Sequence, residues 1–457
     1  MKRNIRLVWL LAGALWVAGA APPQKQLIVE TNSSDDISRI SSRYGVNVVQ
    51  TIREKENNIY VVAVSHGSSK KTAAAIQADP SVKSVASDDD VELPEDSHGG
   101  FPVATALDPM GPSLLLTTSQ SYFGNQVRSG YVQQTGMNLI QLAQAQQQFP
   151  TGNTIVAVID TGVDPTHPAL ANVLVPGFDF IHNTAGLASE LTDLSQSTVA
   201  ILDQSTVAIL DRKRYPVRLN QSTVAILDQS TVAILDGQLP QAFGHGTMVS
   251  GLVHLVAPTA LIMPLKAFSS DGTAEISNIV AAIYYAVDNG AKVINMSFST
   301  PSPPAVLQQA INYASSHGVI SVAAAGNDGK RMTVYPAGYR GVISVESTNK
   351  NDLRSMFSNY SGSESIHLAA PGEALMTTYP GNNYAAVWGT SFSAALVSGA
   401  SALVTDMVPL ATPSYSQYAF DQGTVVGHQE EGGTVRLDLL PTLQYCLQQP
   451  NPTRVDE

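Results

Sequence analysis

The chain has 457 residues, of which 44% are hydrophobic and 14% charged, with a formal net charge of -12 at pH 7. This length and composition allow one large domain with a buried core and a smaller second domain. The acidic balance argues against a nucleic-acid-binding protein, which carries a basic face. The single cysteine, Cys446, excludes an intrachain disulfide and a CxxC or Cys/His zinc site.

The amino terminus has the pattern of a secretory signal peptide. Lys2 and Arg3 precede a short apolar run from Leu7 to Val17, and small residues follow it. The run is short for a bilayer span, which favours a cleaved signal over a retained anchor. We therefore expect residues 1–20 to be removed on export, so that the mature protein is secreted or periplasmic.

Residues 25–93 are predicted to form a small α+β domain, because β-branched runs alternate there with a helix-like stretch. The charge run Asp88-Asp89-Asp90 lies near its end. Residues 94–130 scatter Gly, Pro, Ser and Thr, which is typical of a linker. Within the small domain we expect strands at 27–29, 59–64 and 82–85 and a helix at 69–77.

The rest of the chain predicts an α/β domain. A helix is expected at 138–148, and from Thr154 short continuous apolar runs alternate with helical patterns. Such runs are typical of strands buried on both faces of a parallel sheet, which has helices on both sides and active sites at its carboxyl edge. Strands are expected at 154–159, 261–268, 291–298, 319–325, 342–345 and 366–370, and helices at 275–289 and 304–317.

Two polar residues lie where such a sheet places chemistry. Asp160 ends the strand 154–159, where a partly desolvated carboxylate can hold an imidazole in one tautomer, although an isolated Asp there is more often a cap or turn residue. His245 lies between two glycines and opens a helix-like stretch. The glycines allow close approach of backbones, but this pattern is weak by itself.

Two further residues could stabilise negative charge. Ser391 begins a helix of small and apolar residues, whose free N–H groups suit an oxyanion; an ordinary N-cap serine gives the same pattern. Asn327 follows a strand, and its uncharged amide can donate to an oxyanion or belong to a simple turn.

Together these stretches resemble the subtilisin-like serine proteases, or subtilases. Asp160, His245 and Ser391 follow the family's chain order of Asp, His and Ser. The resemblance implies a parallel-sheet, three-layer subtilisin-like catalytic domain at residues 131–445, followed by a C-terminal tail at 446–457.

The resemblance also implies a serine endopeptidase that works through an acyl-enzyme. Ser391 is expected to attack the peptide carbonyl, His245 to carry the proton, and Asp160 to orient His245. The Asn327 side chain and the Ser391 N–H are expected to hold the oxyanion.

An extended substrate backbone is expected to pair with residues 297–299 and 323–326. We expect no certain cofactor; structural calcium occurs in the family, but no clear calcium site or other metal site stands out. The expected substrate-binding residues are Ser297, Phe298, Ser299, Ala325 and Gly326.

Residues 25–93 resemble, more loosely, the inhibitor-type propeptide of these proteases. This implies a zymogen that processes itself between Leu93 and Gly130. The expected partners are polypeptide substrates and the chain's own propeptide, which acts as inhibitor and chaperone. We expect a monomer with no nucleic-acid partner and no membrane association after signal removal.

The sequence departs from the family pattern near Ser391, where Phe392, Ser393 and Ala395 replace the usual Met, Ala and Pro. These changes concern packing. Ser299, Thr300 and Pro301 also stand where many members have glycines, which leaves the shape of the substrate groove undefined.

Residues 196–236 carry the octet Gln-Ser-Thr-Val-Ala-Ile-Leu-Asp four times, in two tandem pairs. The segment lies between Asp160 and His245, where a long surface insertion costs little. We interpret it as an inserted surface segment that is dispensable for activity. Its apolar core also has a cross-β signature, so a β-hairpin, a partner-binding element or an assembly element are alternatives.

The sequence argues against two other function classes. The Gly-x-Ser-x-Gly elbow of an α/β-hydrolase is missing around Ser391, and the order of the triad is different, which excludes that class. A subtilase fold kept only as a binding module is disfavoured, because all four catalytic positions are filled.

Overall fold

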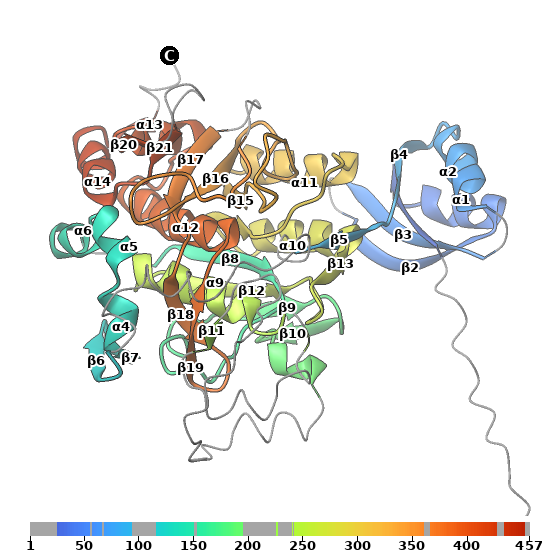
Figure 1. Ribbon diagram of the computed structural model, residues 1–457. Coiled ribbons are helices and arrows are strands. Elements are labelled where there is room, and N and C mark those ends of the chain that lie inside the picture. Colours follow the sequence, from blue (N-terminus) through green and yellow to red (C-terminus); the bar gives the residue numbers. More distant parts are fainter. Residues whose placement is uncertain are drawn as a thin grey trace, which may run out of the picture.

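The structure is a computed structural model. It describes residues 25–54, 57–65, 68–93, 116–149, 153–194, 225–226, 240, 242–360, 366–426 and 434–452. These residues form a large α/β domain and a small amino-terminal domain beside it (Figure 1). The expected signal peptide at 1–20 lies outside the described residues.

The large domain is built on one ten-stranded sheet. Neighbouring strands from β9 to β21 are parallel, and the edge strands β10 and β20 are antiparallel. In spatial order the strands are β10 (Thr184–Gly186), β9 (Gly177–Asp179), β12 (Leu261–Lys266), β8 (Ile155–Asp160), β14 (Val293–Met296), β15 (Ile320–Ala324), β16 (Val342–Thr348), β17 (Ile366–Pro371), β21 (Thr434–Arg436) and β20 (Thr424–Val426).

Helices cover both faces of this sheet, which gives the three layers expected from the sequence. The apolar strands bury alternate side chains in two cores: Val156 and Val158 of β8 face one, and Ala157 and Ile159 face the other. On the first face lie α9 (His245–Val256), α12 (Thr390–Met407), α13 (Pro413–Phe420), α14 (Leu439–Gln448) and α6 (Leu142–Gln148); on the second lie α10 (Ile276–Asp288) and α11 (Ala305–Ser316).

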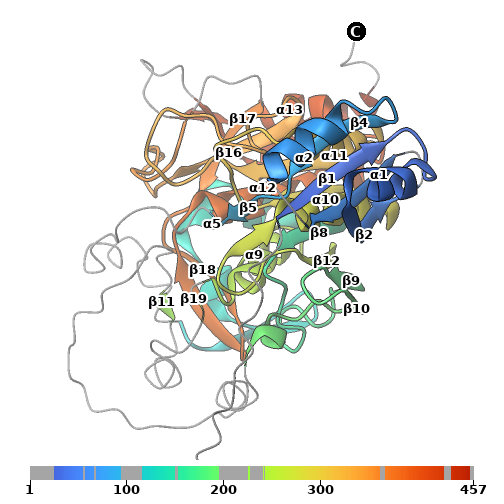
Figure 2. The ribbon, with the colours of Figure 1, turned by 90° about the vertical axis from the view of Figure 1, so that its right-hand side faces the viewer.

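The small domain is a four-stranded antiparallel sheet whose inner face packs against two helices. Its outer face contributes Ile28 and Ile59 to the same core as α10 and α11, and it lies in front of these helices in Figure 2. Its elements are β2 (Val46–Arg53), β3 (Asn58–Val64), β1 (Gln26–Thr31) and β4 (Val82–Ser87), in the order of the sheet, with α1 (Asp36–Tyr44) and α2 (Ser69–Gln77).

A short strand joins the two domains. β5 (Asp90–Glu92) pairs antiparallel with β13 (Thr273–Glu275) of the large domain. The Asp88 carboxylate accepts a hydrogen bond from the Ser277 backbone N–H at 2.8 Å, in the first turn of α10. The end of the small domain is therefore fixed against the large one.

The linker expected at residues 94–130 is wrong for its described final part. A hairpin of β6 (Ser119–Tyr122) and β7 (Asn125–Arg128) leads into α4 (Ser129–Val132). Tyr122 and Val127 are buried in the main core, and the Tyr122 hydroxyl donates to the Leu255 carbonyl at 2.6 Å. The hairpin therefore belongs to the large domain. Its mostly polar sequence gives no indication that Tyr122 and Val127 are core residues.

Two other element boundaries differ from expectation. The helix expected at 138–148 is broken into α5 (Thr135–Leu139) and α6, because Gln141 has a left-handed backbone with φ 54. The expected tail at 446–457 begins inside α14, where Cys446 is buried in the core.

Only residues 225–226 of the repeat segment are described. They form β11 (Ala225–Ile226), which pairs antiparallel with β19 (Asn383–Val387). β19 forms a hairpin with β18 (Leu375–Tyr379). The rest of the expected surface insertion lies outside the described residues. Within the described ranges, no helix has the length and apolar character needed to cross a membrane.

Candidate active site

Asp160 and His245 lie in direct contact. Asp160 ends β8, His245 opens α9, and His245 Nδ1 is 2.7 Å from Asp160 Oδ1. Both side chains are buried. A carboxylate at this distance favours the tautomer with the proton on Nδ1, which leaves Nε2 as a base.

The glycines around His245 have a packing role. A Cβ on Gly246 would lie 2.1 Å from the carbonyl oxygen of Gly162, so only glycine lets α9 approach the turn after Asp160 this closely. Gly244 precedes the helix with φ 90, a conformation that favours glycine.

Ser391 is the second residue of α12 and lies beside Ser297, directly after β14. Its Oγ donates to the Ser297 carbonyl at 3.4 Å, and Ser297 Oγ donates to the Ser391 carbonyl at 3.0 Å. The next residue, Phe392, places its ring 5.6 Å from the imidazole of His245. The structure thus brings the start of α12 against the start of α9.

Asn327 follows β15 and is anchored through its side-chain oxygen. Oδ1 accepts hydrogen bonds from the backbone N–H of Thr390 at 3.0 Å and from its hydroxyl at 2.9 Å. These donors fix the orientation of the amide, so that Nδ2 is its donor group. Nδ2 lies 3.5 Å from the position of a Cβ on Gly389, next to the start of α12.

The expected substrate-binding residues divide into two groups. Ser297 lies beside Ser391, and Ser299 follows two residues later in the chain, whereas the ring of Phe298 is buried against Phe268 with ring centroids 5.2 Å apart. Phe298 could therefore contact a substrate only through its backbone.

The strand pairing expected at 323–326 is wrong for most of this segment. Ala323 and Ala324 belong to β15, which has β14 on one side and β16 on the other. The N–H of Gly326 donates to Thr390 Oγ1 at 3.1 Å, and its carbonyl accepts from Asn359 at 2.9 Å. An interior strand has no free edge for a substrate.

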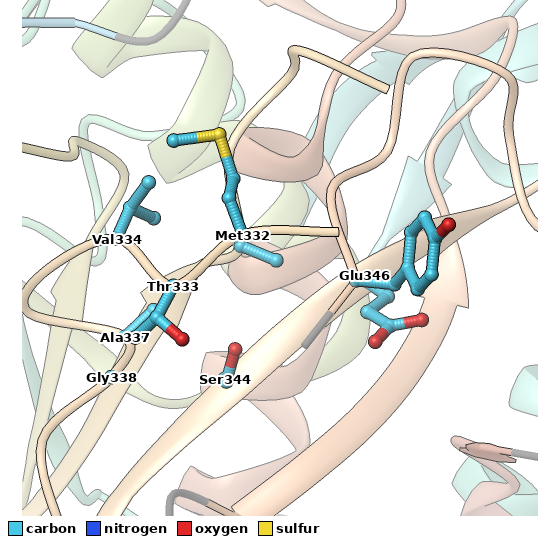
Figure 3. Close-up of a pocket in the computed structure, with 9 residues that line it drawn as sticks. Met332, Thr333, Val334, Ala337, Gly338, Ser344 and Glu346 are labelled. Carbon is cyan, nitrogen blue, oxygen red and sulfur yellow. The ribbon is translucent and has the colours of Figure 1, made fainter. Parts of the chain in front are cut away.

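Ala325 instead lines a small pocket (Figure 3). Ala325 lies two residues before Asn327 in the chain, and the residues that line the pocket are mainly small or apolar. Its other lining residues are Met332, Thr333, Val334, Ala337, Gly338, Ser344, Glu346 and Tyr360.

Glu190 is a buried carboxyl group that the sequence did not single out. It begins the 3-10 helix η3 (Glu190–Asp193), and it accepts hydrogen bonds from Thr161 Oγ1 and Thr247 Oγ1, both at 2.5 Å. Burial raises the pKa of Glu190 to about 7, against the lowering effect of these hydroxyl donors. No local pattern marks this residue, because its partners are far away in the sequence.

Three other histidines lie elsewhere in the large domain. His167 and His254 are buried, and His317 is exposed directly after α11. Among the described residues, no group of three or more His, Cys, Asp or Glu is arranged to hold a metal ion.

The family model described as the subtilase family, Peptidase_S8, matches residues 151–422, and the chain belongs to this family. Thermitase from Thermoactinomyces vulgaris is 32% identical over 282 residues, which cover 59% of this chain and 81% of that protein. Subtilisin BL from Lederbergia lenta is 40% identical over 175 residues, which cover 36% of this chain and 64% of that protein. The chain thus spans less than two thirds of the length of this subtilisin.

A solved structure supports the fold. Fervidolysin from Fervidobacterium pennivorans, described as a keratinolytic enzyme related to subtilisin, matches with a TM-score of 0.63 and 21% sequence identity. The match covers 92% of this chain and 61% of that one.

Proposed function

We propose that the protein is a serine endopeptidase in which Ser391 is the nucleophile, His245 the general base and acid, and Asp160 the carboxylate that orients His245. The observation that carries this proposal is the buried 2.7 Å contact between His245 and Asp160, with the start of α12 packed against the same helix. Ser391 Oγ attacks the peptide carbonyl, and the proton passes through His245 to the leaving amine. Water then hydrolyses the acyl-enzyme.

Asn327 Nδ2 and the Ser391 backbone N–H are the proposed oxyanion donors. The double anchor from Thr390 holds the Asn327 amide before the reaction begins, so little reorganisation is needed when charge develops. Ser297 and Ser299 would contact the substrate backbone, and Ala325 and Gly326 would line the site beside the bound substrate.

The small domain is proposed to act as an inhibitor-type propeptide of a secreted or periplasmic zymogen. Its support is the pairing of β5 with β13 and the contact of Asp88 with the start of α10. Self-cleavage would fall between Leu93 and the start of β6 at Ser119, because the hairpin that begins there packs into the large domain. Polypeptides are the proposed substrates.

Covalent labelling with a serine-reactive fluorophosphonate tests the nucleophile. The wild type should be labelled, and Ser391→Ala should not. Ser393→Ala is the matched control on the same helix, because Ser393 Oγ donates to the Ala370 carbonyl at 3.0 Å and faces away from this chemistry. A folded wild type that is not labelled, or a labelled Ser391→Ala variant, would refute the proposal.

A further inference from the structure

Glu190 connects the two segments that carry Asp160 and His245. Its Oε1 accepts from Thr161 Oγ1 at 2.5 Å and from the Gly246 backbone N–H at 3.0 Å, and its Oε2 accepts from Thr247 Oγ1 at 2.5 Å. Thr161 directly follows Asp160, and Gly246 directly follows His245. Glu190 itself has no exposed surface.

The start of α9 needs such a partner. The first turn of a helix has N–H groups without intrahelical acceptors, and a residue at the N-cap usually supplies one. Here the N-cap is Gly244, which has no side chain. Glu190, far away in the sequence, supplies an acceptor, which the Gly246 N–H shares with Thr161 Oγ1, each at 3.0 Å. It also places a carboxyl group at the positive end of the helix dipole.

The other end of η3 holds the same turn from a second direction. Asp193 Oδ2 accepts from Lys266 Nζ at 2.8 Å and from the Ser270 N–H at 2.7 Å. Lys266 Nζ in turn donates to the Thr161 carbonyl at 2.7 Å. Thr161 is therefore held through its hydroxyl by Glu190 and through its carbonyl by Lys266.

We propose that Glu190 is a positioning residue for the reaction. It holds Thr161 and the first turn of α9 so that Asp160 and His245 stay in hydrogen-bond contact, and its carboxylate favours the protonated imidazole that forms during catalysis. The inference rests on the proposed function, since it assigns a role to the surroundings of that triad.

The charged and titratable groups around Glu190 come from every element packed against it. They are Asp160 of β8, His245 of α9, Lys266 of β12, Asp193 of η3 and Tyr379 of β18. Burial raises the pKa of Glu190 to about 7 and the Asp160 charge adds to this, whereas the hydroxyl donors and Lys266 lower it.

Glu190→Gln and Glu190→Asp separate charge from geometry. The variants are compared by kcat, KM and the pH dependence of kcat/KM on a short peptide p-nitroanilide, with active sites counted by fluorophosphonate labelling. Glu190→Gln should lower kcat about 10- to 100-fold with little change in KM, because small displacements of catalytic groups cost this much. Its acid limb should move to lower pH, because the neutral amide no longer favours the imidazolium.

Glu190→Asp keeps the charge but is shorter by one methylene. Its kcat should fall, while its acid limb stays at the wild-type position. Asp438→Asn is the matched control, because it neutralises a buried carboxylate at the start of α14 and should change neither quantity.

The proposal is overturned if Glu190→Gln keeps the wild-type kcat and acid limb, or if its kinetic change equals that of Asp438→Asn. If Glu190→Gln does not fold, Thr161→Val tests the same connection from the other side; a wild-type kcat in that variant also overturns it. An unlabelled wild type would instead mean that the proposed function fails, which distinguishes the two failures.

Discussion

The roles of Ser391 and Ser393 depend on tertiary contacts that cannot be read from the sequence. The two serines lie in one short stretch, Gly-Thr-Ser-Phe-Ser, and both are buried on α12. Ser393 Oγ donates to the carbonyls of Ala370 and Pro371, whereas Ser391 Oγ lies beside Ser297, near the helix α9 that carries His245. The resemblance to a family distinguishes them in the sequence, and their partners distinguish them in the structure.

Phe392, which replaces the methionine usual in the family, has a packing role in the structure. Its ring is fully buried and lies 5.6 Å from the imidazole of His245. It fills space against the proposed base without offering a polar atom. This agrees with the expectation from the sequence that the change affects packing.

The candidate site was predictable where a residue's own neighbours carry the signal. Asp160 ends a buried strand, His245 stands between glycines, and Ser391 opens a helix. Glu190 and Thr390 carry no such local signal, because each acts on a segment that only the fold brings close. Tertiary hydrogen bonds of this kind leave no periodicity in the sequence.

Buried His254 should make the stability of the protein depend on pH. It is fully buried on α9, and neither ring nitrogen has a hydrogen-bond partner among the described residues. Burial, with the nearby His167, lowers the pKa of His254 to about 4. Because the folded state binds this proton less readily than the unfolded chain, the contribution to stability is present above about pH 6.5 and is lost as the pH falls toward 4.

His254→Met should remove this loss, since methionine fills a similar volume without a titrating group. Both proteins carry Ser391→Ala, which prevents self-digestion, and their free energy of unfolding is measured in urea at pH 7.5 and pH 5. On going to pH 5, the parent should lose about 2 kcal/mol more of this free energy than the variant. His317→Asn, at an exposed position directly after α11, is the control and should follow the parent. Parallel pH profiles for His254→Met and the parent would contradict the assignment.

At the scale of elements, the errors of prediction share one cause. The hairpin of β6 and β7 lies where the sequence predicts a linker, and α5 and α6 lie where it predicts one continuous helix at 138–148. In both places the local composition is polar, and the structure is set by a few residues packed against the large domain. The central strands were found because their burial on both faces leaves continuous apolar runs.

Arg53 on β2 connects the small domain with both α10 and α11. Its guanidinium lies 4.9 Å from the ring centroid of Tyr284 and 4.5 Å from that of Tyr313. It also donates to Asp288 Oδ2 and to the Tyr313 hydroxyl, both at 2.6 Å. Cation–π contacts of a desolvated arginine contribute about 2 kcal/mol, which corresponds to roughly 30-fold in affinity.

Under the proposed propeptide role, Arg53→Ala in the full chain should therefore release the small domain sooner after cleavage. The measurement is the lag between processing and the appearance of peptidase activity, at several protein concentrations. The lag should shorten. On dilution, full activity should already appear at a higher protein concentration than in the wild type, because the small domain binds more weakly. Arg43→Ala removes an ion pair to Asp79 within the small domain and serves as control. An unchanged lag in Arg53→Ala would mean that this contact does not hold the inhibitor in place.

At the scale of the whole molecule, the repeat segment lies inside the sequence of the large domain without interrupting its sheet. In the sequence, residues 196–236 lie between η3 and α9, which are the two elements that Glu190 joins. The only described part of the segment, β11, adds two residues to the edge of β19. Among the described residues, the ten-stranded sheet, the two cores and the candidate site are built from residues outside it.

Deletion of residues 196–236 should consequently give a folded protein that fluorophosphonate labels as completely as the wild type. A shorter connection changes the loop-closure entropy by less than about 2 kcal/mol, so the midpoint of thermal unfolding should shift by no more than about 5 °C. Loss of the octets should also reduce aggregation on prolonged incubation, because they have the composition of cross-β segments.

A deletion extended to residues 189–236 is the matched comparison, because it also removes η3 with Glu190 and Asp193. It should label at least about tenfold more slowly than the shorter deletion if the first turn of α9 depends on that element. Equal labelling of the two deletions would show that the short 3-10 helix is as dispensable as the octets. A folded 196–236 deletion that is not labelled would instead make the repeat part of the working enzyme, and the interpretation as an inserted surface segment would have to be abandoned.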